Sequence, residues 1–117
     1  EETIASGGAD RAVRLWRRFD MEDPDNPPWR LDWHGRLGVE VTCVTFVGTS
    51  LLVAGGDGRR LAVWSTKSGR LAAEIAEAHV AQVSSLCSSP IDQLIATADE
   101  CNVHVWSVPS LERRRSF

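Results

Sequence analysis

The sequence predicts an all-β protein made of repeated units of four antiparallel strands. Three stretches share one pattern: an apolar strand, a turn of small residues with an Asp, and an alternating strand that ends in Trp. These strands end at Trp16, Trp64 and Trp106, which lie 48 and 42 residues apart. Alternation of apolar and polar side chains is typical of strands, and self-similarity at a nearly fixed period indicates a repeat protein.

The repeated pattern covers residues 3–16, 51–64 and 94–106. A further strand precedes the later two copies, at 41–48 and 83–90, where apolar residues alternate with small polar ones. Gly48-Thr-Ser follows the first of these strands and Pro90-Ile-Asp-Gln follows the second, and both stretches favour turns. The order of elements is therefore the same in the second and third units.

A fourth, more polar strand is expected at 30–34, 70–75 and 112–117. Residues 71–78 favour a helix by propensity, but their place in the repeat predicts a strand. The expected organisation is a partial unit with strands two to four over residues 1–36, followed by complete units over 37–77 and 78–117.

Units of this length and pattern resemble the WD-repeat family, in which about 40–45 residues form one four-stranded blade of a β-propeller. The resemblance covers nearly the whole chain apart from residues 17–38. It implies an incomplete propeller of about two and two-thirds blades, because closed propellers have roughly four to eight. We therefore expect a piece of a longer protein, with the remaining blades in the same polypeptide.

In that family a His, a Ser or Thr, an Asp and a Trp form a hydrogen-bonded tetrad within a blade. The resemblance implies a complete tetrad in the third unit and partial ones in the others. The matching residues are His79, Thr97, Asp99 and Trp106 in the third unit, Asp57 and Trp64 in the second, and Ser6, Asp10 and Trp16 in the first. In the second unit Ala54 replaces the hydroxyl residue, and His34 lies three residues too far upstream. We interpret His79 and Asp99 as structural residues rather than a catalytic dyad.

The residue after each Trp departs from the family pattern. An Asp often stands there, whereas this chain has Arg17, Ser65 and Ser107. In some family members a motif containing that Asp docks a ubiquitin-ligase adaptor, and this sequence gives such docking no support.

An acidic, proline-rich insertion occupies residues 19–29 and is predicted to be a loop. Two interpretations stay open: a projection specific for a partner, or a tolerated surface insertion. Trp29 either anchors a partner or folds the loop back, and the spacing of the acids is not that of a calcium loop. The candidate partner contacts are Asp20, Glu22, Asp23, Asp25 and Trp29 in the insertion, with Arg59 and Arg60 in the turn after Asp57.

Composition and motifs disfavour several function classes. The formal net charge of −3 disfavours direct contact with nucleic acid. The three Cys residues form no CxxC pair, and the sequence lacks a phosphate-binding Gly loop, an HExxH motif and a nucleophile elbow. No apolar run is long enough to cross a membrane. We expect no catalytic residues, no metal and no cofactor, and a cytoplasmic or nuclear location.

The resemblance implies a non-enzymatic scaffold or adaptor that binds other proteins or peptides within a multiprotein complex. The alternative is a recognition module of a larger enzyme or ribonucleoprotein complex that binds a modified peptide or RNA. Fold alone does not decide between them.

Overall fold

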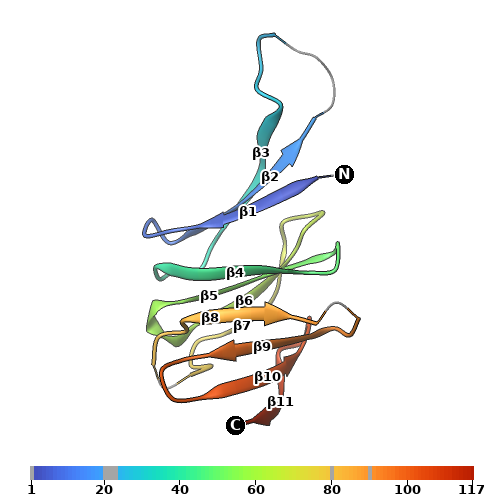
Figure 1. The fold of residues 1–117 in the computed structure, drawn as a ribbon. Coiled ribbons are helices and arrows are strands. Elements are labelled where there is room, and N and C mark those ends of the chain that lie inside the picture. The colour runs from blue at the N-terminus through green and yellow to red at the C-terminus, as the bar shows by residue number, and fades with distance from the viewer. Residues whose placement is uncertain (1, 20–23, 80, 90) are drawn as a thin grey trace.

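The computed structural model describes residues 2–19, 24–79, 81–89 and 91–117. Their strands form three antiparallel sheets that follow one another along the chain (Figure 1). The first sheet contains β1 (Thr3–Gly7), β2 (Ala12–Arg18) and β3 (Trp29–Arg36), in that order.

The other two sheets have four strands each, and in both the neighbours in the sheet are also neighbours in sequence. The second contains β4 (Val41–Val47), β5 (Leu51–Gly56), β6 (Leu61–Ser65) and β7 (Leu71–Ile75). The third contains β8 (Ser85–Ser88), β9 (Leu94–Ala98), β10 (Val103–Ser107) and β11 (Glu112–Ser116). The prediction of an all-β chain with four-stranded antiparallel units is confirmed.

The connection between β5 and β6 contains a short 3₁₀ helix at Asp57–Arg59. Among the described residues, three that are not Gly have positive φ, namely Arg11 (70°), Arg59 (73°) and Leu111 (56°). Residues other than Gly rarely adopt positive φ, so we infer that the flanking strands hold these turns in this conformation.

The bounds of β3 and β8 differ most from those expected. β3 is longer than residues 30–34, because Trp29 pairs with Arg18 and Arg36 pairs with Ala12 at its two ends. β8 begins at Ser85 rather than at Val83, whose amide donates instead to the carbonyl of Gly56 in the second sheet. The strand expected at residues 70–75 is present as β7 (Leu71–Ile75) despite the helix propensity of this segment, because β7 pairs with β6.

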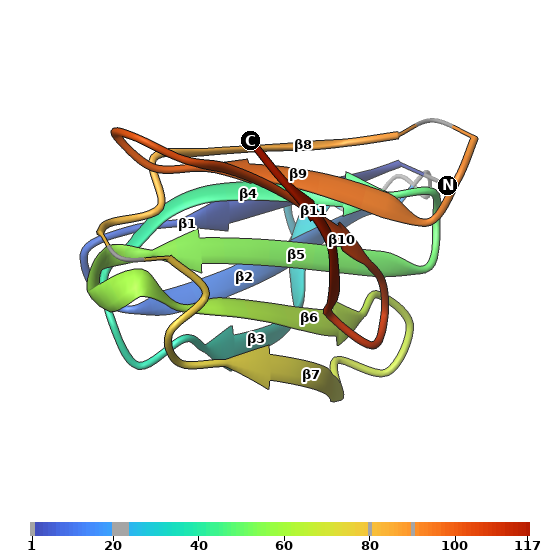
Figure 2. The ribbon, with the colours of Figure 1, turned by 90° about the horizontal axis from the view of Figure 1, so that it is seen from below.

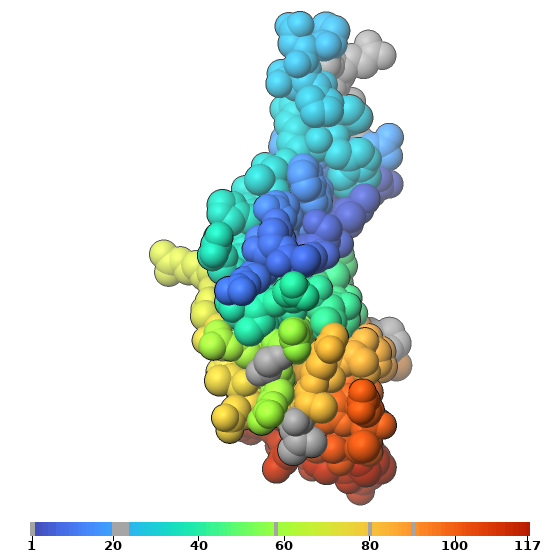
Figure 3. Space-filling model, turned by 90° about the vertical axis from the view of Figure 1, so that its left-hand side faces the viewer, coloured from blue at the N-terminus to red at the C-terminus, as the bar shows by residue number. Residues whose placement is uncertain are grey.

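The sheets stack in chain order, with the two termini at opposite ends of the stack (Figures 1 and 3). The antiparallel order places the turns at two ends of the strands, on the left and right of Figure 2. We call one the β5–β6 end; it also carries the β1–β2 and β9–β10 turns. The other, the β4–β5 end, also carries the β2–β3, β6–β7, β8–β9 and β10–β11 connections.

Two apolar clusters lie between the sheets. Val13, Leu15, Leu52 and Trp64 belong to the cluster between the first and second sheets. Val53, Val63, Ile95 and Trp106 belong to the one between the second and third. Leu52 and Val53 are neighbours on β5 with no exposed surface, so β5 is buried on both faces. Burial of each such side chain contributes about 1.5–3 kcal/mol.

The outer face of the first sheet carries an apolar row. Ile4 lies opposite Trp16, which lies opposite Leu31 across the three strands. Ile4 is 49% exposed and Leu31 is 46% exposed. This face is apolar in the same way as those that pack between the sheets.

Candidate functional site

The third unit brings the four tetrad residues together. His79 lies in the connection between β7 and β8, Thr97 in β9, Asp99 in the β9–β10 turn and Trp106 in β10. His79 Nδ1 is 2.8 Å from Asp99 Oδ2, and His79 Nε2 is 2.5 Å from Thr97 Oγ1. Trp106 Nε1 donates to the same Thr97 oxygen at 2.8 Å.

Chemistry fixes the direction of these hydrogen bonds. Trp can only donate and a carboxylate can only accept. The chain therefore runs from the Trp106 N–H to Thr97 Oγ1, from the Thr97 hydroxyl to His79 Nε2, and from His79 Nδ1–H to Asp99. Each polar group in the chain has a partner, and a complete buried network of this kind stabilises one arrangement of its segments.

Asp99 also organises its own turn. Its Oδ1 accepts from the amides of Cys101 at 2.8 Å and Asn102 at 2.7 Å. The Cys101 amide hydrogen bond, with those from His79 and Asn102, holds the pKa of the Asp99 carboxyl well below its usual range, although burial acts to raise it. Asp99 is therefore ionised at neutral pH.

The His79–Asp99 pair is closed to solvent. Both side chains have a relative exposure of 0%, so no substrate atom can reach the ring or the carboxylate. The pair fastens the β7–β8 connection to the third sheet. We interpret it as a structural element that positions the turns of the β5–β6 end.

The second unit has an apolar counterpart of this network. Leu37 stands 42 residues before His79, as Val41 stands 42 residues before Val83, and it is 1% exposed. Ala54 lies opposite Ala62, as Thr97 lies opposite His104. Leu37 and Ala54 pack with Trp64 in one cluster. Sequence reasoning missed Leu37 because it searched for a His and considered His34, which is exposed on β3.

The first unit holds the remaining tetrad candidates. Trp16 Nε1 donates to Ser6 Oγ at 3.1 Å. Asp10 accepts from the amide of Ala12 at 3.3 Å and forms an ion pair with Arg14 at 2.7 Å. The hydrogen bond from Arg14 is the main reason that the pKa of Asp10 lies below its usual value. Asp57 of the second unit is exposed in its turn.

Arg59 and Arg60 lie at the β5–β6 end. Arg59 is exposed, and its carbonyl accepts from the amide of Ala78 at 2.9 Å. Arg60 is half-buried, and its Nη1 donates to the carbonyl of Leu37 at 3.3 Å. Both arginines therefore lie in a turn that is hydrogen-bonded to the β3–β4 and β7–β8 connections.

A hollow of about 360 Å³ opens beside this turn, between the first and second sheets. Its lining combines a cation with two carboxylates on closely spaced backbone segments. The lining residues are Arg11, Gly38, Val39, Glu40 and Asp57.

The described part of the insertion, residues 19 and 24–29, lies at the other end of the strands. Asp25 is exposed, and Trp29 is half-buried at the start of β3. The base of the loop is closed, because the amide of Phe19 donates to the carbonyl of Pro28 at 2.7 Å and the Arg30 guanidinium lies 4.5 Å from the Phe19 ring centre. Asp20, Glu22 and Asp23 lie outside the described residues. The structure therefore separates Asp25 and Trp29 from Arg59 and Arg60.

Within the described part of the chain, no cluster of three or more His, Cys, Asp or Glu side chains is arranged to hold a metal ion. The same residues contain no helix long and apolar enough to cross a membrane.

Comparisons with known proteins agree with this architecture. Residues 72–107 match the family model described as "WD domain, G-beta repeat". A p21-activated protein kinase-interacting protein 1-like protein from Danio rerio is 30% identical over 118 residues, which cover 97% of this chain and 28% of that protein. A chain in the crystal structure of the mitotic checkpoint complex superposes with a TM-score of 0.77 at 22% identity, over 98% of this chain and 35% of the solved one. The chain thus spans about a third or less of the length of either protein.

Proposed function

We propose that this chain, a WD-repeat protein built of β-propeller blades and therefore a protein-interaction domain, is a non-enzymatic scaffold. In this role it holds protein partners in a multiprotein complex. We assign partner contact to the β5–β6 end. The observation that carries this proposal is the hollow lined by Arg11, Glu40 and Asp57 beside Arg59 and Arg60. Mixed charge on a rigid surface favours specific docking of another protein.

Backbone hydrogen bonds support the rigidity of this surface. The amide of Leu37 donates to the carbonyl of Arg11 at 3.0 Å, and the amide of Asp57 donates to the carbonyl of Glu40 at 2.9 Å. The segments that carry the charged side chains are thus fastened to one another across the two sheets. A surface fixed before binding loses less conformational entropy when a partner docks.

Two further points favour a protein partner. The Danio rerio relative is named for its interaction with a protein kinase, and the solved chain belongs to a checkpoint complex. The net charge of −3 disfavours a polyanion such as RNA. We place the scaffold in the cytoplasm or nucleus.

The test is quantitative affinity capture with the intact protein and two charge-reversal variants. Arg59→Glu changes the β5–β6 end, and Arg114→Glu makes the same change on exposed β11. We expect a stoichiometric protein complex that Arg59→Glu weakens and Arg114→Glu preserves. An intact protein that binds no protein and turns over a small molecule contradicts the proposal.

A further inference from the structure

A second buried imidazole lies beside the tetrad of the third unit. His104 on β10 is 9% exposed, and its ring centre is 4.5 Å from that of His79, with the two ring planes 40° apart. The ring of Trp106 meets the His104 ring edge-on, with their centres 5.9 Å apart. His104 Nδ1 is 2.7 Å from Ser116 Oγ on β11. His104 therefore connects the tetrad to β11, at the far end of the stack from β1 (Figure 1).

The other two sheets show that a blade packs without an imidazole at this position. Ala62 on β6 and Arg14 on β2 correspond to His104, because each lies opposite the tetrad hydroxyl position of its own sheet. Ala62 has no exposed surface, whereas Arg14 forms an ion pair at the edge of its sheet. The position accepts an apolar or a cationic residue, so packing alone does not explain an imidazole.

The surroundings of His104 favour its neutral form. In the described part of the chain, the charged and ionisable groups that act on it are His79 from the β7–β8 connection, Asp99 from the β9–β10 turn and Arg113 from β11. The residues paired with it on β9 and β11 carry hydroxyl groups and no charge. Burial first, and then His79 and Arg113, hold the pKa of His104 below its usual value, while Asp99 acts in the opposite direction.

Acid therefore favours conformations in which His104 reaches water. In an opened segment an imidazole titrates near its ordinary pKa of about 6.5, so the opened state binds a proton more readily than the closed state. The stabilisation of the closed state is complete above that pH and is lost progressively as the pH falls below it. The structure thus couples the protonation of one side chain to the position of its neighbours.

β11 is the neighbour that opens most readily. All five residues of Glu112–Ser116 are exposed, and among the described strands β11 pairs with β10 alone. The β7–β8 connection is held by the buried His79–Asp99 pair and by a hydrogen bond to the Arg59 carbonyl. Local opening begins in segments with few buried contacts. Opening of β11 also carries the Arg113 guanidinium away from the imidazole.

We propose that His104 makes β11 a pH-sensitive switch, which closes on the third sheet when the imidazole is neutral and opens on mild acidification. His104 takes up a proton from the solvent, and β11 separates from β10. The free edge of β10 is then available for pairing with another strand. This device goes beyond the proposed function, since it involves neither the hollow at the β5–β6 end nor a bound partner.

The test is amide hydrogen exchange of the intact protein, followed by NMR at about pH 7.5 and 5.5, on either side of the ordinary His pKa. Rates are expressed as protection factors, which removes the pH dependence of exchange in a free peptide. His104→Ala introduces the residue of the second unit, and Arg113→Leu introduces the residue that β3 and β7 carry at the matching position. His34→Ala, at an exposed position of β3, is the matched control.

We expect the protection of the β11 amides to fall about threefold or more between the two pH values, while the β9 amides keep theirs. His104→Ala should abolish the fall, because no proton is taken up at this position. Arg113→Leu should reduce it, because a charged imidazole then meets less repulsion. His34→Ala should leave it unchanged. Thermal unfolding at the higher pH checks that each variant remains folded.

The switch is overturned if β11 keeps its protection at the lower pH, or if β9 and β11 lose protection equally, which indicates global unfolding. Persistence of the fall in His104→Ala has the same consequence. If that variant does not fold, Arg113→Leu decides, because it leaves the imidazole in place and an unreduced fall contradicts the proposal. None of these measurements requires a partner, so they neither support nor weaken the scaffold function.

Discussion

At the scale of single residues, the same blade position is filled in two ways. His79 and Thr97 make a polar chain with Trp106, whereas Leu37 and Ala54 pack directly on Trp64. The sequence resemblance predicted the polar set, because its residue types are distinctive. It could not identify the apolar set, because a buried Leu has no feature that separates it from any other core Leu.

Thr97→Val is expected to destabilise the protein by about 1–3 kcal/mol. The substitution keeps the shape but removes the oxygen that accepts from Trp106 and bonds His79, and it leaves buried polar groups without partners. Urea unfolding measures the change. Thr49→Val, at an exposed turn position, serves as the control and is expected to have little effect. Equal stability of the two variants contradicts a structural role for the polar chain.

The low pKa of Asp99 predicts a pH dependence of stability. A carboxyl group whose pKa is lower in the folded state binds protons more readily in the unfolded chain. Its stabilising contribution is complete above the unfolded value of about 4 and is lost as the pH falls below it. Asp99→Asn should therefore destabilise the protein at pH 7 and make a smaller difference at pH 3, as measured by urea unfolding. Asp92→Asn, which removes an exposed charge, should show no such trend.

At the scale of strands, each of the three repeat tryptophans, Trp16, Trp64 and Trp106, follows an irregularity in the sheet. The pairing with the fourth strand shifts between Leu15 and Trp16, between Val63 and Trp64, and between Val105 and Trp106. A bulge bends the strand and increases its twist locally. Alternation of side chains predicted the strands themselves, but it carries no signal for an extra residue in the partner strand. The bulges therefore emerge only from the structure.

Gly35 in β3 tests how closely the first and second sheets pack. A Cβ added at Gly35 would lie 2.6 Å from Trp64 Nε1, so the ring or the strand must move. Gly35→Ala is expected to cost about 1–3 kcal/mol of stability, as overpacking typically does. Gly8→Ala is the matched control, because its nearest neighbour, Asp10 Oδ1, lies 3.8 Å away. Chemical denaturation of both variants should show a clear loss for Gly35→Ala alone.

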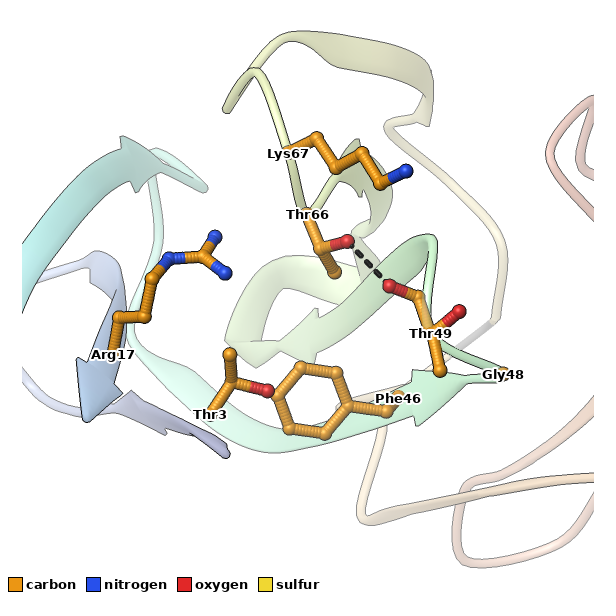
Figure 4. A pocket seen from close by; sticks show the side chains of 7 residues that line it. All are labelled: Thr3, Arg17, Phe46, Gly48, Thr49, Thr66 and Lys67. Atoms are coloured by element: carbon orange, nitrogen blue, oxygen red, sulfur yellow. Dashed lines mark hydrogen bonds between the residues drawn. The ribbon is translucent and has the colours of Figure 1, made fainter. Parts of the chain in front are cut away.

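At the scale of the whole molecule, the stack of sheets carries two separate polar surfaces. One is the hollow at the β5–β6 end of the strands, and the other lies at the β4–β5 end. The strand order was predictable from the repeat, and so was the grouping of Arg59 and Arg60 in one turn. A pocket of about 420 Å³ at the β4–β5 end (Figure 4) was not predictable, because Thr3 and Arg17 of the first sheet meet Phe46 and Lys67 only when the first and second sheets pack. Sequence spacing describes neighbours within a sheet and gives little information about side chains that meet between sheets.

Hydrogen exchange of the intact protein, with and without the partner recovered by affinity capture, tests the assignment of the partner surface most directly. We predict that binding slows amide exchange in the turns that surround the hollow, at residues 8–11, 37–40 and 57–60. The β10–β11 turn and β11 should exchange at the same rate in both states. Protection confined to β11, or absent from all three of the named turns, would contradict the account.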